Sequence, residues 1–428
     1  MHKRLLAVFS TLMLRGLGSG ISVIFTILVS RYLETSSAAH FFFLFNISTI
    51  AAVCFRWGLD EVIVRRVAAS SENEVDDIAN GVIGLAHRRI LIWGILAMLA
   101  MFVSVNSLDR ELLHGIGLFE GGIVIFSAVM IALVACAARI KQGLGYTNLA
   151  TFLLNIAVPM FSLIVMLVFL LSGITIDSGK LILIYASVSV ICYLFVIFRH
   201  YGSPVKIIIK VTRHTLNDVR KDAYAANKLG VVVLAQQALI WTALLVIPLM
   251  YGSEQYKGFV VAQKLSMLIS LLMLAVNFTF SSRFASLHAA GKLSELRRIV
   301  SYSAVAILVA SIGVLFIMII AKDFILQYAK IDTDMTDVLM ILLVSQVLFS
   351  LTALFSVVLS MCRDDNYLLL SQSVTNTLGV IIFITVSFSF SIEYACMVFF
   401  VIYFALSLLL GARAYQLTGK SRCEVSSL

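Results

Sequence analysis

Long, uninterrupted apolar runs recur along the whole chain, with only short connections between them. Each run has 18 or more residues, and a helix needs about 20 residues to cross a bilayer. A membrane-spanning strand would instead show about 9–11 residues of alternating polarity. The runs therefore predict membrane-spanning helices. They lie at 5–30, 41–58, 90–107, 121–138, 151–171, 181–198, 229–250, 258–280, 299–321, 338–358, 368–388 and 394–411.

The composition agrees with a chain that lies mostly in lipid. Of its 428 residues, 61% are hydrophobic and 13% are charged, whereas a typical soluble domain has about 25% charged residues. This composition excludes a soluble enzyme, a nucleic-acid-binding domain and a disordered protein. We expect an all-α integral membrane protein of about twelve transmembrane helices, arranged in two pseudo-symmetric six-helix lobes.

The positive charges indicate how the chain crosses the membrane. With the N-terminus inside, 23 of the 32 Lys and Arg residues fall in inner segments and 6 fall in outer segments. Cytoplasmic loops collect Lys and Arg, so we expect both termini in the cytoplasm. The remaining three cations lie within the apolar runs.

The longest inner connection, 199–228, carries seven cations and divides the chain into halves of similar length. Two short outer segments, 33–41 and 251–259, stand at matching places in the halves, and transporters often contain such repeats. We expect an N-terminal lobe at 1–198, a basic cytoplasmic linker at 199–228, a C-terminal lobe at 229–411 and a cytoplasmic tail at 412–428.

The sequence carries no motif of an enzyme or of a metal centre. It lacks G-x-S-x-G, H-E-x-x-H and the P-loop, and its six cysteines show no C-x-x-C spacing. Its seven histidines are scattered in or near loops, as solvated histidines would be. We expect no enzyme activity, no cofactor and no metal, and we read the cysteines as small core residues.

Three ionisable residues fall inside the runs, and all three are cations: Arg15, Arg56 and Lys264. Ionisable groups inside a membrane are expensive and commonly functional. The nearest carboxylates, Asp60 and Glu61, follow the inner end of the second run. A route whose fixed charges are positive suits an anionic passenger and is poorly equipped to bind a cation.

Arg15 gives the strongest support for a functional role, because inserting a helix with an Arg at its centre into a membrane costs about 2.5–3.5 kcal/mol. At 100° per residue it falls on one polar stripe of the first helix. The stripe consists of Thr11, Arg15, Ser19, Ser22, Thr26 and Ser30. We interpret it as one wall of a hydrated cavity. The alternative is that Arg15 extends to the interface and the small polar residues pack against a neighbouring helix.

Other polar residues are candidates with competing explanations. Lys264 is a candidate ligand but lies within reach of the outer interface, and Arg56, which precedes Trp57, can equally be an interfacial anchor. Gln237 and Gln263 can line the cavity or form hydrogen bonds between helices. The candidate substrate-binding residues are therefore Arg15, Lys264, Arg56, Ser19, Ser22, Thr26, Gln237 and Gln263.

Three short segments resemble a known family of membrane proteins. They are Leu33-Glu34-Thr35-Ser36-Ser37 after the first run, Gly58-Leu59-Asp60-Glu61-Val62-Ile63-Val64-Arg65 after the second and Tyr256-Lys257-Gly258-Phe259-Val260-Val261-Ala262-Gln263-Lys264-Leu265 at the eighth. With the twelve runs in two halves, they resemble the polysaccharide-exporter branch of the multidrug/oligosaccharidyl-lipid/polysaccharide (MOP) flippase superfamily. Within that branch the chain resembles O-antigen flippases of the Wzx type.

This resemblance implies a MATE-like fold and a specific activity. Such proteins move an undecaprenyl-diphosphate-linked oligosaccharide from the cytoplasmic to the periplasmic leaflet of the bacterial inner membrane, by rocking two lobes around a cationic cavity. Arg15 would bind the diphosphate, because its planar fork donates two hydrogen bonds at once. Lys264 would be a second contact and Arg56 a contact at the inner gate. The implied partners are membrane lipids, a polysaccharide polymerase and a chain-length regulator, but no nucleic acid.

Two other functions fit parts of the sequence. A multidrug/toxin cation antiporter of the same superfamily would share the fold, but we would expect it to carry a carboxylate inside a span to bind H⁺ or Na⁺. A membrane-embedded polysaccharide polymerase would need large outer loops. The longest outer segment here, at about 322–337, has room for one surface helix at most.

The expected topology can be tested by labelling single cysteines from outside the cell with a membrane-impermeant maleimide. Positions in 172–180 and 322–337 should react, and positions in 199–228 should react only after the membrane is permeabilised. The reverse pattern would show that the orientation inferred from the charges is wrong.

Overall fold

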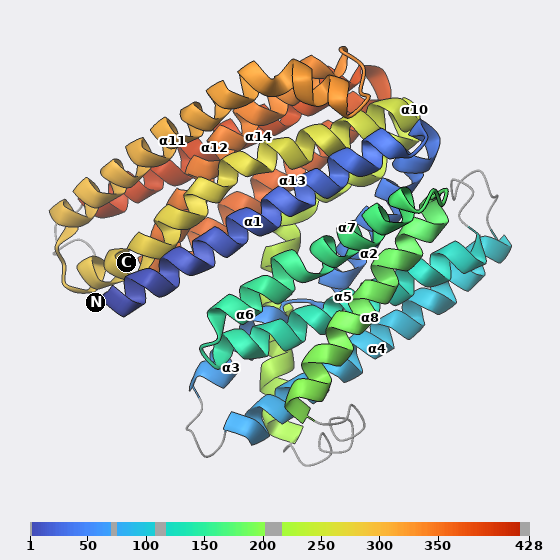
Figure 1. The fold of residues 1–428 in the computed structure, drawn as a ribbon. Helices are drawn as coiled ribbons and strands as arrows, with labels where there is room; N and C mark the ends of the chain where they lie inside the picture. Colours follow the sequence, from blue (N-terminus) through green and yellow to red (C-terminus); the bar gives the residue numbers. More distant parts are fainter. Residues whose placement is uncertain (1, 70–74, 108–116, 202–215, 420–428) are drawn as a thin grey trace. The chain divides into compact units, whose positions relative to one another are not determined.

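A computed structural model describes residues 2–69, 75–107, 117–201 and 216–419. All regular structure in these ranges is helical (Figure 1). Eleven of the described helices are long and apolar enough to cross a membrane. One of the eleven candidate segments, Val233–Leu271, has 39 residues and contains a break at Gly252. If the two arms of this segment are counted separately, the number of candidate spans equals the twelve predicted runs. The predicted all-α membrane fold is confirmed.

The chain divides into two compact units, and the first helix contributes to both of them. The N-terminal unit consists of Met13–Phe25 and Leu33–Leu234. The C-terminal unit consists of the chain up to Leu12, Thr26–Tyr32 and the chain from Ala235 onward. Helix α1, His2–Tyr32, thus has its middle in one unit and both ends in the other. The sequence pattern instead predicted the whole of α1 in the N-terminal lobe.

Helix α5, Leu118–Gly143, forms the centre of the N-terminal unit and is the most buried of its candidate spans. It packs against most of the other helices of this unit, because a row of small buried side chains, including Ala128, Ala132 and Ala135, lets neighbouring backbones approach closely. Its neighbours are α2 (Thr35–Arg56), α3 (Leu59–Ala69), α4 (Val75–Ser107), α6 (Thr147–Phe152), the π-helical segment Leu153–Ala157 and α8 (Ser178–Tyr201). Helix α7, Val158–Leu171, continues from the π-helical segment and packs on α8.

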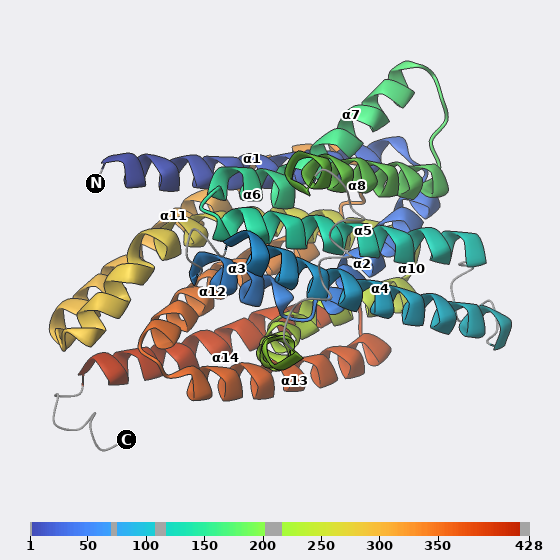
Figure 2. The same ribbon diagram turned by 90° about the horizontal axis from the view of Figure 1, so that it is seen from below.

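Helices α12 and α14 form the centre of the C-terminal unit. Helix α14, Ile392–Gly419, packs on α12, Met335–Met361, and on α13, Asp365–Ser389. Figure 2 shows α13 and α14 running side by side. Helix α11, Leu293–Tyr328, packs on α12 and α14. Only 11% of the residues in its most apolar 18-residue stretch are buried. Most of its surface is therefore available to lipid.

Helix α10, Leu216–Ala289, is bent where the seventh and eighth apolar runs were expected to meet. Gly252 has φ 81° and ψ 177°, a conformation that residues with a Cβ rarely adopt. Pro248 lies one turn earlier and lacks the N–H that would continue the helical hydrogen bonds. The helix also begins at Leu216, within the range 199–228 predicted as a linker, of which 202–215 lies outside the described residues.

The carbonyl groups at and just after the C-terminal end of α11 accept hydrogen bonds from three side chains of the same unit. Ser30 Oγ donates to Ala329 O at 2.8 Å, and Arg31 Nη1 donates to Tyr328 O at 2.9 Å. Lys257 Nζ donates to Lys330 O at 2.7 Å. Carbonyls at a helix C-terminus have no partner within the helix and favour positive charge. These three donors form what we call the α11 end cap, which holds the end of α1 to the C-terminal unit.

The chain reverses between α2 and α3 through a left-handed turn made by Trp57 and Gly58, whose φ angles are 37° and 76°. A Cβ on Gly58 would lie 2.2 Å from the carbonyl oxygen of Ala226 on α10. Across the same contact, a Cβ on Gly230 would lie 2.7 Å from the Trp57 ring. The turn therefore fits against α10 only because neither glycine carries a side chain.

We predict that Gly58→Ala destabilises the protein by more than about 2 kcal/mol, about 1 kcal/mol from the positive φ and the rest from the clash with backbone. Gly145→Ala is the matched control, because Gly145 has φ 86° but no atom lies within 4 Å of the position that an added Cβ would take. Gly145→Ala should lower the free energy of unfolding only by the conformational cost of about 1 kcal/mol. Equal losses in thermal unfolding experiments on the two variants would contradict the close approach at Gly58.

Candidate functional site

The N-terminal unit contains a cluster of charged side chains where α2, α3 and α5 meet. Arg56 is the last residue of α2, and its Nε donates to Ala52 O at 3.1 Å. After the Trp57–Gly58 turn, Asp60 lies at the start of α3 with its Oδ2 3.2 Å from Arg56 Nη1. The side chains of Arg56 and Asp60 are only 12% and 23% exposed, so this ion pair is much less screened by solvent than a surface pair.

Arg139 on α5 adds a second guanidinium to the same carboxylate. Its Nε lies 3.9 Å from Asp60 Oδ2, and its Nη1 donates to Gln142 Oε1 at 2.7 Å. One turn earlier on α5, the fully buried Cys136 lies within the electrostatic field of Asp60, Arg56 and Arg139. Asp60 Oδ1 is buried and forms no hydrogen bond with any residue that the structure describes.

Arg15 completes this group from α1. It is partly buried and lies close enough to Arg139 for the two guanidinium groups to repel each other. Arg56 and Arg139 thus share the carboxylate of Asp60, and Arg15 is a neighbour of Arg139. We call these four residues the arginine cluster. Its formal charge is +2, because one carboxylate neutralises only one of the three cations.

The cluster corrects two expectations from the sequence. The carboxylates nearest the spans were expected to remain outside the set of intramembrane charges, but Asp60 pairs with Arg56. Arg56 therefore has a carboxylate partner within the N-terminal unit. Arg139 follows the predicted run at 121–138 and was counted among the 23 cations of the inner segments, whereas it lies on α5 within a candidate span. The four-residue spacing of Arg56 and Asp60 was a signal for this pair, because such residues lie on one face of a helical path.

Helix α1 approaches this part of the unit through a glycine. A Cβ on Gly18 would lie 2.8 Å from Asn155 O, at the π-helical segment Leu153–Ala157. Asn155 itself donates to Thr151 O at 3.3 Å. Close packing at Gly18 thus sets the middle of α1 against this irregular segment, three residues from Arg15. Ser19 and Ser22 are partly exposed on the same stretch of helix.

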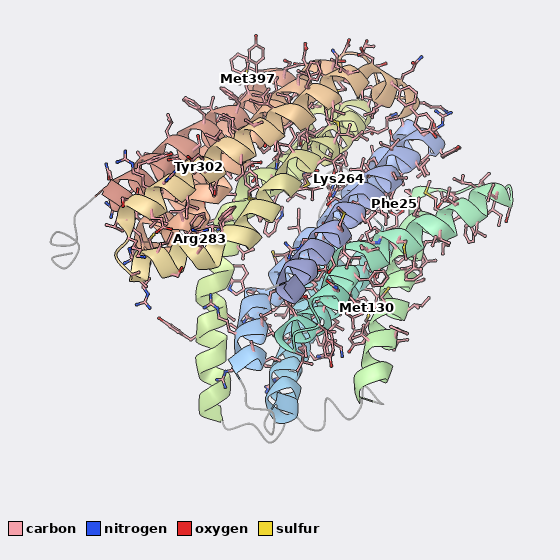
Figure 3. The ribbon with its side chains drawn as sticks, turned by 60° about the vertical axis from the view of Figure 1, so that its left-hand side comes forward. Phe25, Met130, Lys264, Arg283, Tyr302 and Met397 are labelled. Atoms are coloured by element: carbon pink, nitrogen blue, oxygen red, sulfur yellow. The ribbon has the colours of Figure 1, made fainter. Side chains whose placement is uncertain are left out.

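Lys264, the lysine that the sequence placed inside an apolar run, belongs to the C-terminal unit. Lys264 lies on the second arm of α10 and is partly buried (Figure 3). No described residue forms a hydrogen bond or ion pair with its ammonium group. The adjacent Gln263 is 6% exposed, and its Nε2 donates to Met267 Sδ at 3.2 Å on the same helix. One N–H of the Gln263 amide is therefore used within α10.

A chain of amide and hydroxyl groups crosses the C-terminal unit between four helices. Gln236 Nε2 on α10 donates to Gln372 Oε1 on α13 at 3.0 Å, and Gln372 Nε2 donates to Ser356 Oγ on α12 at 3.0 Å. Ser356 then donates to Thr352 O, and Thr352 Oγ1 contacts Tyr403 O on α14 at 3.2 Å. The sequence pattern pointed to Gln237, which is partly buried, instead of its neighbour Gln236.

The eight predicted substrate-binding residues are divided between the two units. Arg15, Ser19, Ser22 and Arg56 belong to the N-terminal unit. Thr26, Gln237, Gln263 and Lys264 belong to the C-terminal unit, and Thr26 is 4% exposed. The residues that the sequence did not single out are Asp60 and Arg139 of the arginine cluster and the Gln236–Gln372–Ser356 chain.

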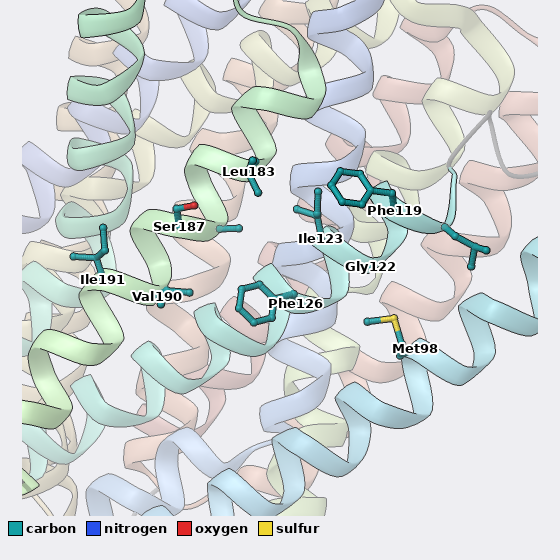
Figure 4. Close-up of a pocket in the computed structure, with 11 residues that line it drawn as sticks. Met98, Phe119, Gly122, Ile123, Phe126, Leu183, Ser187, Val190 and Ile191 are labelled. Carbon is teal, nitrogen blue, oxygen red and sulfur yellow. The ribbon is translucent and has the colours of Figure 1, made fainter. Parts of the chain in front are cut away.

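An apolar pocket of about 550 Å³ opens between α4, α5 and α8 of the N-terminal unit (Figure 4). Met98, Phe119, Phe126 and Leu183 are among its lining residues, and Ser187 supplies its only side-chain hydroxyl. The pocket suits a hydrocarbon chain and offers nothing to a charged group. In the described part of the chain, no group of three or more His, Cys, Asp or Glu side chains could hold a metal ion.

Comparisons with known proteins establish the fold. No family model and no curated protein matches the chain. An inward-facing multidrug resistance MATE family transporter of the MOP superfamily is similar with a TM-score of 0.74 at 14% identity, over 97% of this chain and 99% of that chain. The outward-facing conformation of such a transporter has a TM-score of 0.66 at 16% identity, over 97% and 96%.

A third solved structure is a MOP superfamily transporter from Pyrococcus furiosus Vc1, for which a reverse polarity of the binding pocket is described as suggesting a different function. Its TM-score is 0.66 at 15% identity, over 97% of this chain and 96% of that chain. The chain is therefore a multi-pass membrane protein with a MATE-like fold, as the sequence predicted.

We predict strong coupling between Arg56 and Asp60. In a double-mutant cycle of Arg56→Gln and Asp60→Asn, the interaction energy should be about 1–3 kcal/mol, because either single change leaves a poorly solvated charge. The matched control is Arg283–Glu295, which has the same 3.2 Å separation but side chains 56% and 43% exposed. Its coupling should be about 0–1 kcal/mol.

Both cycles can be measured by equilibrium unfolding in mixed detergent micelles. Equal coupling energies at the two pairs would show that the arginine cluster is as solvated as the protein surface.

Proposed function

We propose that this protein moves an undecaprenyl-diphosphate-linked oligosaccharide, such as an O-antigen repeat unit, across the bacterial inner membrane by alternating access. The observation that carries the proposal is the arginine cluster. Three guanidinium groups and one carboxylate leave a formal charge of +2 in a membrane-embedded unit, and a diphosphate supplies the opposite charge.

The chemistry of guanidinium groups supports this assignment. Arginine binds phosphate oxygens through two parallel N–H···O bonds, and such charge-assisted bonds are about twice as strong as neutral ones. Arg56 and Arg139 are held by Asp60, Ala52 and Gln142, so their positions are fixed before cargo arrives. We assign the first contact with the diphosphate to Arg15, with Lys264 as a second cationic contact.

The other parts of the cargo match other parts of the protein. An oligosaccharide is recognised by hydroxyl and amide groups, and we assign this role to Ser19, Ser22, Thr26, Gln237 and Gln263. The proposal also includes cytoplasmic N- and C-termini and, as partners, membrane lipids, a polysaccharide polymerase and a chain-length regulator. The Pyrococcus furiosus transporter supports it by analogy, because a reversed pocket polarity there is taken to suggest a different function on the same fold.

A multidrug cation antiporter is the second candidate, and two observations favour it. Multidrug MATE transporters share the fold, and Asp60 provides a partly buried carboxylate of the kind expected in an antiporter. Against it, Asp60 is held between two arginines. A cation would have to compete with both guanidinium groups for that carboxylate.

The two candidates can be separated in proteoliposomes. We expect the wild-type protein to translocate a fluorescent polyprenyl-diphosphate glycan, and Arg15→Ala to slow this at least about tenfold, since a hydrogen bond to a charged group contributes about 1.5–3 kcal/mol. Arg15→Lys should retain part of the rate, because the charge remains although the bidentate geometry does not.

Arg283→Gln serves as the control for this experiment, because it removes an exposed cation that already has a carboxylate partner. The proposal fails if Arg15→Ala flips the glycan lipid at the wild-type rate in correctly inserted protein. Uptake of a cationic dye in exchange for H⁺ or Na⁺, without glycan-lipid flipping, would establish the antiporter instead.

A further inference from the structure

Two exposed arginines, Arg297 and Arg298, lie near the start of α11. Arg283 at this end of the C-terminal unit pairs with Glu295 at 3.2 Å, and Arg413 pairs with Asp364 at 2.7 Å. Arg297 and Arg298 are exposed and form no ion pair with any carboxylate in the described part of the chain. Their positive charge is therefore available to an outside partner.

Aromatic side chains hold both arginines in place. The Arg298 guanidinium lies 5.5 Å from the centre of the Tyr302 ring, and the Arg297 guanidinium lies 5.7 Å from that of Tyr415 on α14. Tyr415 is in turn fixed by a 3.2 Å contact between its hydroxyl and Ser301 Oγ. Figure 3 shows Tyr302 and Arg283 at the same end of the C-terminal unit.

The depth of these residues places them at the membrane boundary. The apolar run of α11 begins at about residue 299, so Arg297 and Arg298 stand just outside the hydrocarbon core. Tyr302 stands one turn further in and is 62% exposed. Tyrosine is enriched at this level because its ring sits among the headgroups and upper acyl chains.

An exposed apolar stripe continues from Tyr302 along the same face of α11. At 100° per residue the members of this stripe and Arg298 fall within an arc of about 80°. Its exposed fractions are 62% at Tyr302, 58% at Val305, 65% at Val309, 50% at Ile312, 63% at Phe316 and 68% at Ile320. We call Arg297, Arg298 and this stripe the α11 lipid track.

We propose that the α11 lipid track binds an anionic phospholipid, with the phosphate on Arg297 and Arg298 and one acyl chain along the half of the stripe nearest to them, because a lipid reaches only to the middle of the bilayer. The order of groups along this track complements the order of groups along such a lipid. The two guanidinium groups face the phosphate, Tyr302 lies at the level of the headgroups, and the apolar stripe faces the acyl chain. Basic residues at a membrane surface attract anionic lipids, and here the neighbouring carboxylates are already occupied by Arg283 and Arg413.

The test is a titration of the full-length protein in a neutral detergent with phosphatidylglycerol or phosphatidylcholine, followed by the thermal unfolding midpoint from tryptophan fluorescence. Phosphatidylglycerol should stabilise the wild-type protein more than phosphatidylcholine does. In Arg297→Gln/Arg298→Gln the half-saturating phosphatidylglycerol concentration should rise about 25-fold, about fivefold for each cation removed.

Arg283→Gln/Arg413→Gln is the matched control, because it also removes two positive charges at this end but only from arginines with carboxylate partners. Its half-saturating concentration should stay within about twofold of the wild-type value. Arg297→Lys/Arg298→Lys should also retain binding, which separates loss of charge from a folding defect.

Three results would overturn the proposal. Equal weakening in both Gln double variants would show only a diffuse effect of net charge. Equal stabilisation by inorganic phosphate at the same ionic strength would show a site for a free anion. A dimer in detergent that dissociates on Val309→Asn would show that the apolar stripe belongs to an interface between two copies of this chain.

Discussion

A polar group in hydrocarbon is stable only when another group of the protein satisfies it. The backbone meets this condition by forming helices throughout the described residues. The few polar side chains inside the spans meet it in different ways. Arg56 and Asp60 neutralise each other, Gln236 and Gln372 share an amide hydrogen bond, and Lys264 has no described partner. Polar side chains that lack such a partner inside a span are the best candidates for a functional role.

The arginine cluster contains more cations than carboxylates, and two of its arginines are held in place by Asp60. The ion pair with Asp60 joins the end of α2 to α3 and draws Arg139 of α5 to the same point. One carboxylate organises the cations without neutralising all of them. Without the Asp60 carboxylate, the three guanidinium groups would only repel one another. With two further carboxylates, the formal charge of the cluster would be zero, and it would not attract an anion. This excess of cations is the basis on which we propose an affinity for a diphosphate.

The sequence predicted the fold better than the site, for physical reasons. Continuous apolar runs of membrane-spanning length can only be helices, so the spans followed directly. The pairing of Arg56 with Asp60 depends on the left-handed turn at Trp57 and Gly58, which hydropathy does not record. The hydrogen bonds of Gln236 depend on which helices become neighbours. The division of α1 between two units likewise depends on tertiary packing, whereas the sequence suggested one lobe for each half.

Helix α1 has a mechanical consequence for a protein of this kind. Its middle segment belongs to the N-terminal unit, and its last turn is hydrogen-bonded within the C-terminal unit through the α11 end cap. Helix α10 also belongs to both units, because they divide between Leu234 and Ala235. Gly16 and Gly20 of α1 meet no atom where a methyl group would stand, and glycine weakens the interior of a helix. Bending of α1 would therefore cost least at these two glycines.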